Sequence, residues 1–261
     1  MKRITLTSIL LLLLTSNGAF AFDLEVNGVF YNIIDKNSDI VEVTNGANVT
    51  NSYTVENLII PSEIVVSNKT YKVKRIGQRA FMGCDKIKSI ILPNSLTSIG
   101  NSAISVCKSL TSIDIPNSVT SIDIFAFAGC ENLTSISLPI SLDSISDALF
   151  VGCSSLTNIK IPDSVKYIGQ KAFMLCSSLE SIKIPKKVVE LLGCASFIEC
   201  KKLKYFEVNW EVPPKVNPFL TEDIDVNSCT LIVPDGLKSR YQAADGWKNF
   251  HKIEENNKRV N

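Results

Sequence analysis

The sequence has very little histidine, since His251 is the only one among 261 residues. Serine-type catalysis and most zinc sites use an imidazole, and there is no C-x-x-C pair to give zinc an alternative set of ligands. The glycines form no phosphate-binding loop and no dinucleotide-binding fingerprint. We therefore expect no metal, no cofactor and no catalytic residues, although the many Asp and Glu residues leave a carboxylate-pair hydrolase open.

An excess of one charge and long apolar runs are also missing. Lys and Arg number 27 against 26 Asp and Glu, so no basic stripe is available for nucleic acid. The apolar run 9–14 is too short to span a bilayer, which takes about 20 residues. It follows Lys2 and Arg3 and precedes Ala19-Phe20-Ala21, the pattern of a secretory signal peptide. We predict residues 1–21 as this peptide. The chain is expected outside the cell or on the cell surface, with the periplasm as the alternative.

What the sequence does have is a repeat of 23 residues, in five copies that keep one phase. They begin with "YKVKRIGQRAFMGCDKIKSIILPNS" at Tyr71 and end with "VKYIGQKAFMLCSSLESIKIPKK". A sixth, degenerate copy spans 188–210, where one inserted residue moves the cysteine to Cys200. A fixed period of this length indicates one supersecondary unit stacked on itself. The repeated positions are Ile76, Ile99, Ile122, Ile145 and Ile168, then Cys84, Cys107, Cys130, Cys153 and Cys176, and Pro93, Pro116, Pro139, Pro162 and Pro185.

Each copy predicts one short strand, as in "LTSIDIP". Leu110, Ile113 and Ile115 are expected to point into the core, and Pro116 ends the strand because proline cannot donate to a ladder. A second apolar cluster in each copy, such as Val165, Ile168, Ala172 and Phe173, must face the same interior. One copy alone buries too little apolar surface to fold, so the coils must stack and their two ends must be covered.

The repeat "IPxSVxxIGxxAFxxCxxLxSI" resembles the BspA-type leucine-rich repeats of exported bacterial proteins. The C-terminal "LIVPDGLKSRYQAADGWKNFHKI", residues 231–253, is similar to a segment with which members of that family end. The resemblance implies an α/β but mostly β solenoid with parallel strands and about six coils. The repeats occupy 71–210 in this interpretation.

Both ends of the solenoid are predicted to be capped. Residues 22–70 form a β-rich N-terminal cap, with a hairpin at Asn27-Gly28, a strand at 40–44 and a second hairpin turn at 67–69. The C-terminal capping segment is 211–261, with a last strand at 230–233 and a short helix-like segment. The aromatic residues of that segment cover the final coil, and a ligand-binding aromatic platform is the alternative; the recurring positions are Tyr241, Ala244, Trp247 and Phe250.

Eight cysteines in an exported chain raise the question of disulfides. Stacked coils lie about 4.8 Å apart, so spacing alone does not forbid bridges. We predict that Cys84 to Cys176 form a ladder of reduced, buried thiols, because each takes a small apolar position of the repeat. Cys194, Cys200 and Cys229 lie off this ladder and are the candidates for disulfides or free thiols.

The candidate binding site is the outer side of the repeated strands, expected to be concave. The second and fifth strand residues should point to solvent. They are Lys88, Ile91, Thr111, Asp114, Thr134, Ser137, Thr157, Lys160, Glu180, Lys183, Lys204 and Glu207. The middle coils are rich in Ser and Thr, whereas Lys160, Lys183, Lys186, Lys187 and Lys204 gather toward the C-terminal coils. The projected area is roughly 380 Å², below the ~800 Å² per partner of a stable interface, so this face alone should bind weakly.

The resemblance implies a non-enzymatic protein-binding or adhesion module. Its expected partners are proteins, including extracellular-matrix and host or other cell-surface proteins. One alternative is a carbohydrate-binding module, for which Ser/Thr rungs and Tyr205 would meet sugar hydroxyls. A hydrolase and a periplasmic structural or assembly protein are the others.

Overall fold

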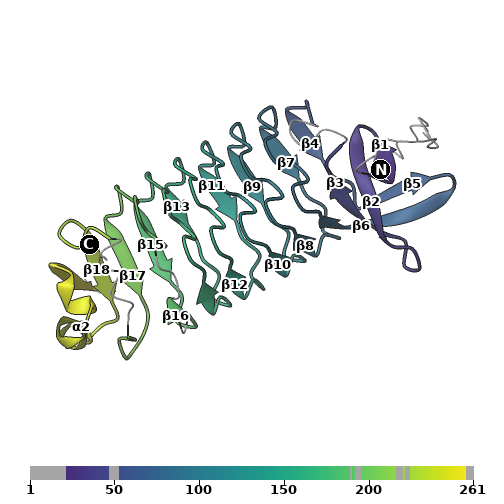
Figure 1. Cartoon of the computed structure of the whole chain (residues 1–261). Helices are drawn as coiled ribbons and strands as arrows, with labels where there is room; N and C mark the ends of the chain where they lie inside the picture. The colour runs from purple at the N-terminus through teal and green to yellow at the C-terminus, as the bar shows by residue number, and fades with distance from the viewer. Residues whose placement is uncertain are drawn as a thin grey trace.

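The computed structural model describes residues 22–46, 53–188, 190–191, 195–215, 220 and 224–256. The chain winds into a mostly β solenoid of about seven turns, with a period near 23 residues and very little helix. Figure 1 shows the coils stacked along one axis, with the β1, β2 and β5 strands at one end and α2 (Lys238–Ala243) at the other. The predicted fold class is confirmed.

One side of the solenoid is a ladder of parallel strands, one from each coil. The strands of the "LxxIxI" segments are β7 (Ser89–Ile91), β9 (Ser112–Asp114), β11 (Ser135–Ser137), β13 (Asn158–Ile159), β15 (Ser181–Ile184) and β17 (Tyr205–Val208). β4 (Asn57–Ile59) precedes them, and β18 (Thr230–Val233) and β19 (Lys252–Glu255) follow. Residues of these strands that point to solvent, together with the turns after them, form what we call the strand face.

A second ladder of parallel strands lies on another side of each coil. It begins with the long strand β6 (Lys69–Ile76) and continues with the two-residue strands β8 (Ser98–Ile99), β10 (Ser121–Ile122), β12 (Ser144–Ile145), β14 (Tyr167–Ile168) and β16 (Glu190–Leu191). The sequence predicted only one strand per coil. Two-residue strands were missed because they are too short to show the alternation by which a strand is recognised.

Backbone hydrogen bonds also join the coils on the third side. The N–H groups of Phe127, Phe150 and Phe173 donate to carbonyls of the following coil, at 3.1, 2.9 and 3.0 Å. Residues with positive φ recur here at the same point of successive coils, such as Gly129 and Gly152. Each coil therefore depends on its neighbours on three sides.

The interior repeats with the sequence. The rings of Phe127, Phe150, Phe173 and Phe197 form one stack, with centroids 5.8, 5.6 and 5.7 Å apart. All four are fully buried. Each of these rings packs against the rings of neighbouring coils, which explains why phenylalanine recurs at this position of the repeat.

The cysteines form a second interior ladder. Cys107 Sγ donates to the carbonyl of Phe81 at 3.0 Å, and Cys153 Sγ to that of Phe127 at 3.2 Å. Burial raises the pKa of the Cys130 thiol to about 12, so the thiol form is favoured at neutral pH.

Cys200 was wrongly placed off this ladder. Its Sγ donates to the carbonyl of Phe173 at 3.2 Å, the contact that the other ladder cysteines make one coil earlier. The inserted residue is absorbed before Phe197, so the sequence count shifts but the stacking does not. Cys229 is a buried free thiol, and Cys194 lies outside the described residues.

The N-terminal end is a sheet built from hairpins. β1 (Leu24–Val26) and β2 (Val29–Asp35) are joined through Asn27 and Gly28, whose φ values are 52° and 74°. These values are those of the predicted tight turn. β3 (Ile40–Thr44) pairs with β2 and with β6, while β5 (Glu63–Val66) forms the second predicted hairpin with β6.

At the C-terminal end, α2 and the 3₁₀ helix η1 (Trp247–Asn249) cover the core. Tyr241 and Trp247 are fully buried, and their polar atoms donate to the carbonyls of Trp210 and Pro214, each at 2.8 Å. These aromatic side chains face the core, which favours the cap over an exposed ligand platform. The prediction that 230–233 is the last strand was wrong, because β19 follows the helices.

The predicted signal peptide, residues 1–21, lies outside the described residues. Among the helices that are described, none is long and apolar enough to cross a membrane. The boundaries proposed at 22–70, 71–210 and 211–261 stay predictions.

Candidate functional site

The structure brings the predicted site residues together on the strand face. All of them are exposed except Glu207, which is half-buried. Neighbouring strands hold them in register: Asp114 lies beside Ser137 on the next strand, and Lys183 lies beside Glu207. The pattern of inward first, fourth and sixth residues, taken from "LTSIDIP", is confirmed by Leu110, Ile113 and Ile115, which are 5% exposed or less.

The C-terminal part of the strand face is lined with ion pairs. Lys183 Nζ lies 2.6 Å from Glu207 Oε1, and Lys204 Nζ lies 3.3 Å from Glu180 Oε2. Lys186 is paired in the same way with Glu211 at 3.0 Å. The lysine cluster read from the sequence is thus largely neutralised by glutamates of adjacent coils.

The middle of the strand face has a different character. A hollow of about 330 Å³ is lined by Asp114, Ser135, Ile136, Ser137, Leu138, Ile140, Lys160 and Pro162. Ser135 and Ser137 carry small side chains on β11, while Asp114 and Lys160 come from the coils on either side. Neither charged residue forms an ion pair with any other described residue. The two charges lie two coils apart, or roughly 10 Å at ~4.8 Å per coil.

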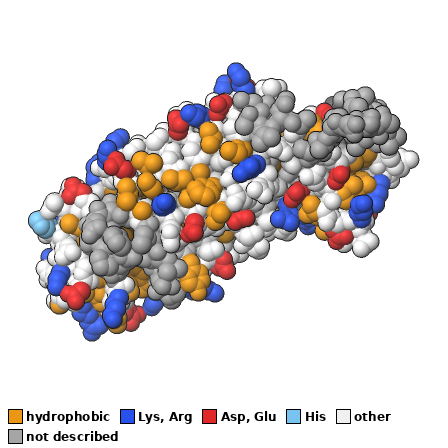
Figure 2. Space-filling model, in the orientation of Figure 1, with side chains coloured by type: hydrophobic (Ala, Val, Ile, Leu, Met, Phe, Trp, Pro, Cys, Tyr) orange, Lys and Arg blue, Asp and Glu red, His pale blue; other side chains and the backbone are white. Residues whose placement is uncertain are grey.

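Exposed aliphatic side chains lie at this hollow and on the strands that precede it. Ile140, in the turn after β11, is 73% exposed, and Ile59 and Ile91, which lie side by side on β4 and β7, are 65% and 58% exposed. Figure 2 shows hydrophobic side chains gathered over the middle coils, with single acidic and basic side chains among them. Large apolar side chains in an exposed group are more informative than scattered ones, because they mark surfaces that another molecule covers.

Ile59, Ile140 and Ser135 were missed as site residues. The signal for Ile140 was present in the sequence. The residue after the repeat proline is Asn94, Asn117, Asp163 or Lys186 in other coils, and isoleucine replaces a polar residue at this point. The backbone N–H of Ile140 donates a hydrogen bond to Asn117 Oδ1 of the preceding coil at 3.1 Å, which holds this turn in place.

One threonine of the strand face, Thr134, is less available than the sequence suggested. Thr134 Oγ1 donates to the carbonyl of Thr111 at 3.0 Å. Thr97 and Thr120, which directly precede β8 and β10 of the second ladder, donate to carbonyls of the preceding coil in the same way, at 2.9 and 3.4 Å. Where the hydroxyl proton is used inside the protein, the side chain offers a sugar only its acceptor lone pairs.

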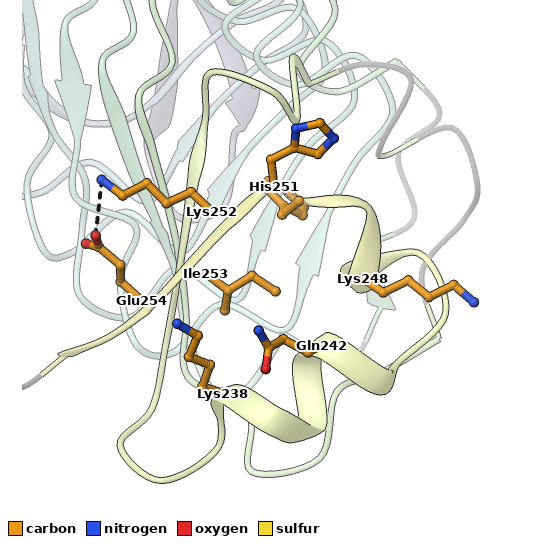
Figure 3. A pocket seen from close by; sticks show the side chains of 8 residues that line it. Lys238, Gln242, Lys248, His251, Lys252, Ile253 and Glu254 are labelled. Carbon is orange, nitrogen blue, oxygen red and sulfur yellow. Dashed lines mark ion pairs between the residues drawn. The ribbon is translucent and has the colours of Figure 1, made fainter.

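The described part of the chain gives little indication of a metal site or of a catalytic nucleophile. No group of three or more His, Cys, Asp and Glu residues among the described residues is placed to hold a metal ion. His251 is exposed beside a second hollow, of about 430 Å³, at the C-terminal end (Figure 3). Burial raises the pKa of the Cys107 and Cys153 thiols well above their ordinary value, which disfavours the nucleophilic thiolate.

Comparison with known proteins agrees with this architecture. The family model described as "BspA type Leucine rich repeat region" matches six copies, over residues 50–153 and 105–213. The chain belongs to the BspA-type leucine-rich repeat family. A search of curated proteins finds no match.

Two solved structures show the extent of the likeness. The T. pallidum Leucine Rich Repeat protein is 25% identical, covers 89% of this chain and 98% of its own, and superposes with a TM-score of 0.63. A leucine rich cell surface protein from Faecalibacterium prausnitzii is 20% identical, with 88% and 72% covered and a TM-score of 0.55. This second likeness supports the fold alone.

Proposed function

We propose that this BspA-type chain is a non-enzymatic, exported protein-binding module, and that it binds through the middle of the strand face. The observation that carries the proposal is the hollow at β11, with exposed Ile140 at its rim and, on either side, Asp114 and Lys160, which form no ion pair within the described part of the chain. Such a surface suits a protein segment that inserts an apolar side chain and meets both charges. Protein interfaces likewise combine apolar and polar residues in one patch.

The proposed partner class rests on the family. Membership of the BspA-type family supports a role in adhesion to extracellular-matrix, host or other cell-surface proteins. The exposed isoleucines favour a protein over a carbohydrate, since sugar sites rely on aromatic side chains and free hydroxyls. The strand face is small for a stable complex, so adhesion would need several copies to act together.

The test is binding of residues 22–261 to immobilised matrix proteins and polysaccharides. We expect saturable binding to a protein, and at least a tenfold loss of affinity in Ile140→Asp. The matched control is Lys183→Glu, which changes charge on the same face outside the hollow and should keep the affinity within threefold. Equal loss in both variants would contradict the proposed location. Binding to polysaccharide alone, inhibited by free glycan, would contradict the proposed partner class.

A further inference from the structure

The strand ladder has an open edge at its C-terminal end. β13, β15, β17, β18 and β19 form one sheet in that order, so each inner strand has a neighbour on both sides and β19 has only β18 among the described residues. β18 and β19 pair along their whole length, from Thr230 beside Lys252 to Val233 beside Glu255. The outer edge of β19 therefore presents backbone N–H and C=O groups without a strand partner in the described part of the chain.

A hollow runs along this edge. Its lining includes three consecutive residues of β19, 252–254, and the two residues before them, together with Lys238, Gln242 and Lys248. Successive residues of a strand point to opposite faces, so a hollow on one face would be lined by alternate residues. Lining by consecutive residues indicates that the hollow follows the backbone edge of β19.

The helix α2 forms the opposite wall. Lys238 and Gln242 are four residues apart and lie on the same side of the helix. Figure 3 shows both side chains reaching from α2 toward the strand that carries Ile253. The C-terminal cap closes the core with Tyr241, Trp247 and Phe250. Its helix is joined to the end of β19, since the Lys238 N–H donates to Glu255 Oε1 at 3.2 Å. A groove between a helix and a strand edge is a geometry in which an extended peptide adds to a sheet.

The charges around the groove indicate what such a peptide carries. Lys252 is paired with Glu254 at 3.1 Å, and Lys248 with Asp245 at 2.6 Å. Lys238 is the lysine of this lining whose ammonium forms no ion pair with another described residue, and Gln242 adds a neutral amide. Glu255, at the end of β19 and outside the lining, accepts a hydrogen bond from the Lys238 backbone N–H. Among the lining residues themselves, the unbalanced charge is positive.

We propose that the groove between β19 and α2 binds an extended peptide segment with acidic side chains, which adds as a further strand to β19 and meets Lys238 with a carboxylate. The segment is recognised by its backbone and its charge. This site lies apart from the hollow at β11 and does not depend on the function proposed for the strand face.

The test uses a fluorescent hexapeptide of alternating Glu and Val and the chain 22–261. We expect saturable binding. Two further peptides are N-methylated at alternate residues, one set at odd and one at even positions. Strand addition predicts that one set loses at least tenfold in affinity, because its methyl groups block the bonds to β19, while the other set binds as before. Equal affinity of both sets, or no saturable binding, would overturn the proposal.

Protein variants check the position and the charge. Lys238→Glu should weaken the peptide at least threefold, whereas Ile140→Asp and Lys160→Glu on the strand face should leave its affinity unchanged. A matched hexapeptide with Lys in place of Glu should bind at least tenfold more weakly. If that peptide binds equally well, the acidic assignment is wrong. If the chain dimerises and the dimer excludes the peptide, the edge is an interface between copies and the peptide assignment is overturned.

Discussion

The interior ladders and the strand face are built on the same coils but follow opposite rules. Inside, the same residue recurs at each level, as in the stack from Phe127 to Phe197 and the thiol ladder from Cys107 to Cys200. On the strand face, the fifth strand position changes from Ile91 to Asp114, Ser137, Lys160, Lys183 and Glu207. Because identical side chains recur in the interior, each coil packs on the next in the same way. Because the strand-face side chains differ from coil to coil, one part of that surface differs chemically from another.

The largest expected effect concerns the thiol ladder and pH. Burial raises the pKa of the Cys130 thiol to about 12, against about 9 in the unfolded chain. The stabilisation is therefore complete below pH 9 and is lost as the pH rises from 9 toward 12, because only the unfolded state releases the proton. Each such thiol should lower the free energy of unfolding by about 1.4 kcal/mol per pH unit in that range.

Urea unfolding with a reductant at pH 8, 9 and 10 measures this slope. Cys130→Ala removes one titrating thiol. It should therefore reduce the fall in unfolding free energy with pH by the contribution of one proton, about 1.4 kcal/mol per pH unit. An unchanged slope in Cys130→Ala would show that the ladder thiols do not carry the pH dependence.

The next effect concerns the phenylalanine stack. Phe173 is fully buried between Phe150 and Phe197, so Phe173→Ala should leave a cavity and cost about 3–5 kcal/mol of unfolding free energy. Phe125, which is 43% exposed, provides the control, and Phe125→Ala should cost less than about 1 kcal/mol. Chemical denaturation of both variants decides the matter. If both variants lost a similar amount of unfolding free energy, the stacked phenylalanines would not contribute more to stability than an exposed one.

A smaller effect concerns the repeated backbone of the third side. Gly152 has φ of 74°, and an added Cβ would meet nothing closer than the backbone of Gly129 at 3.6 Å. Gly152→Ala should cost about 1–2 kcal/mol, from left-handed backbone strain rather than from a clash. Ser155→Ala, in the same coil, should change the stability by less than about 0.5 kcal/mol, and thermal unfolding compares the two. No difference between them would argue against a required left-handed residue at 152.

The smallest effect concerns the strand-face ion pairs. Lys183→Glu places a carboxylate beside Glu207 and should cost at most about 1 kcal/mol, since exposed pairs contribute little. The exchange Lys183→Glu with Glu207→Lys should restore most of the loss. Denaturation at low and at high salt measures it, and a loss that salt does not reduce would contradict an electrostatic origin.

Much of the interior could be predicted from the sequence because it repeats. The period fixed which isoleucine, cysteine and phenylalanine residues share a rung, and Asn27-Gly28 fixed the first hairpin. Cys200 was misplaced because it lies 24 residues after Cys176 and so departs from the 23-residue spacing, although the inserted residue accounts for that shift. β19 was missed because its residues, Lys252 to Glu255, include one strongly apolar side chain.

The sequence predicted which residues lie on the strand face, but not which of them form ion pairs or line a hollow. Which residues point outward follows from the alternation along each strand. Which lysines are neutralised depends on the register between coils, and Lys183 and Glu207 are 24 residues apart because of the insertion. The hollow at β11 depends on how small Ser135 and Ser137 are relative to the side chains around them, which only the packed structure reveals.

The central claim is that the middle coils of the strand face bind protein, and amide hydrogen exchange with and without a captured partner tests it most directly. A partner bound at the hollow should slow exchange in residues 112–118 and 135–141, around β9, β11 and the turn that carries Ile140, with little change in β15 and β17. Slower exchange confined to 181–184 and 205–208, or equal change along the whole strand face, would contradict it.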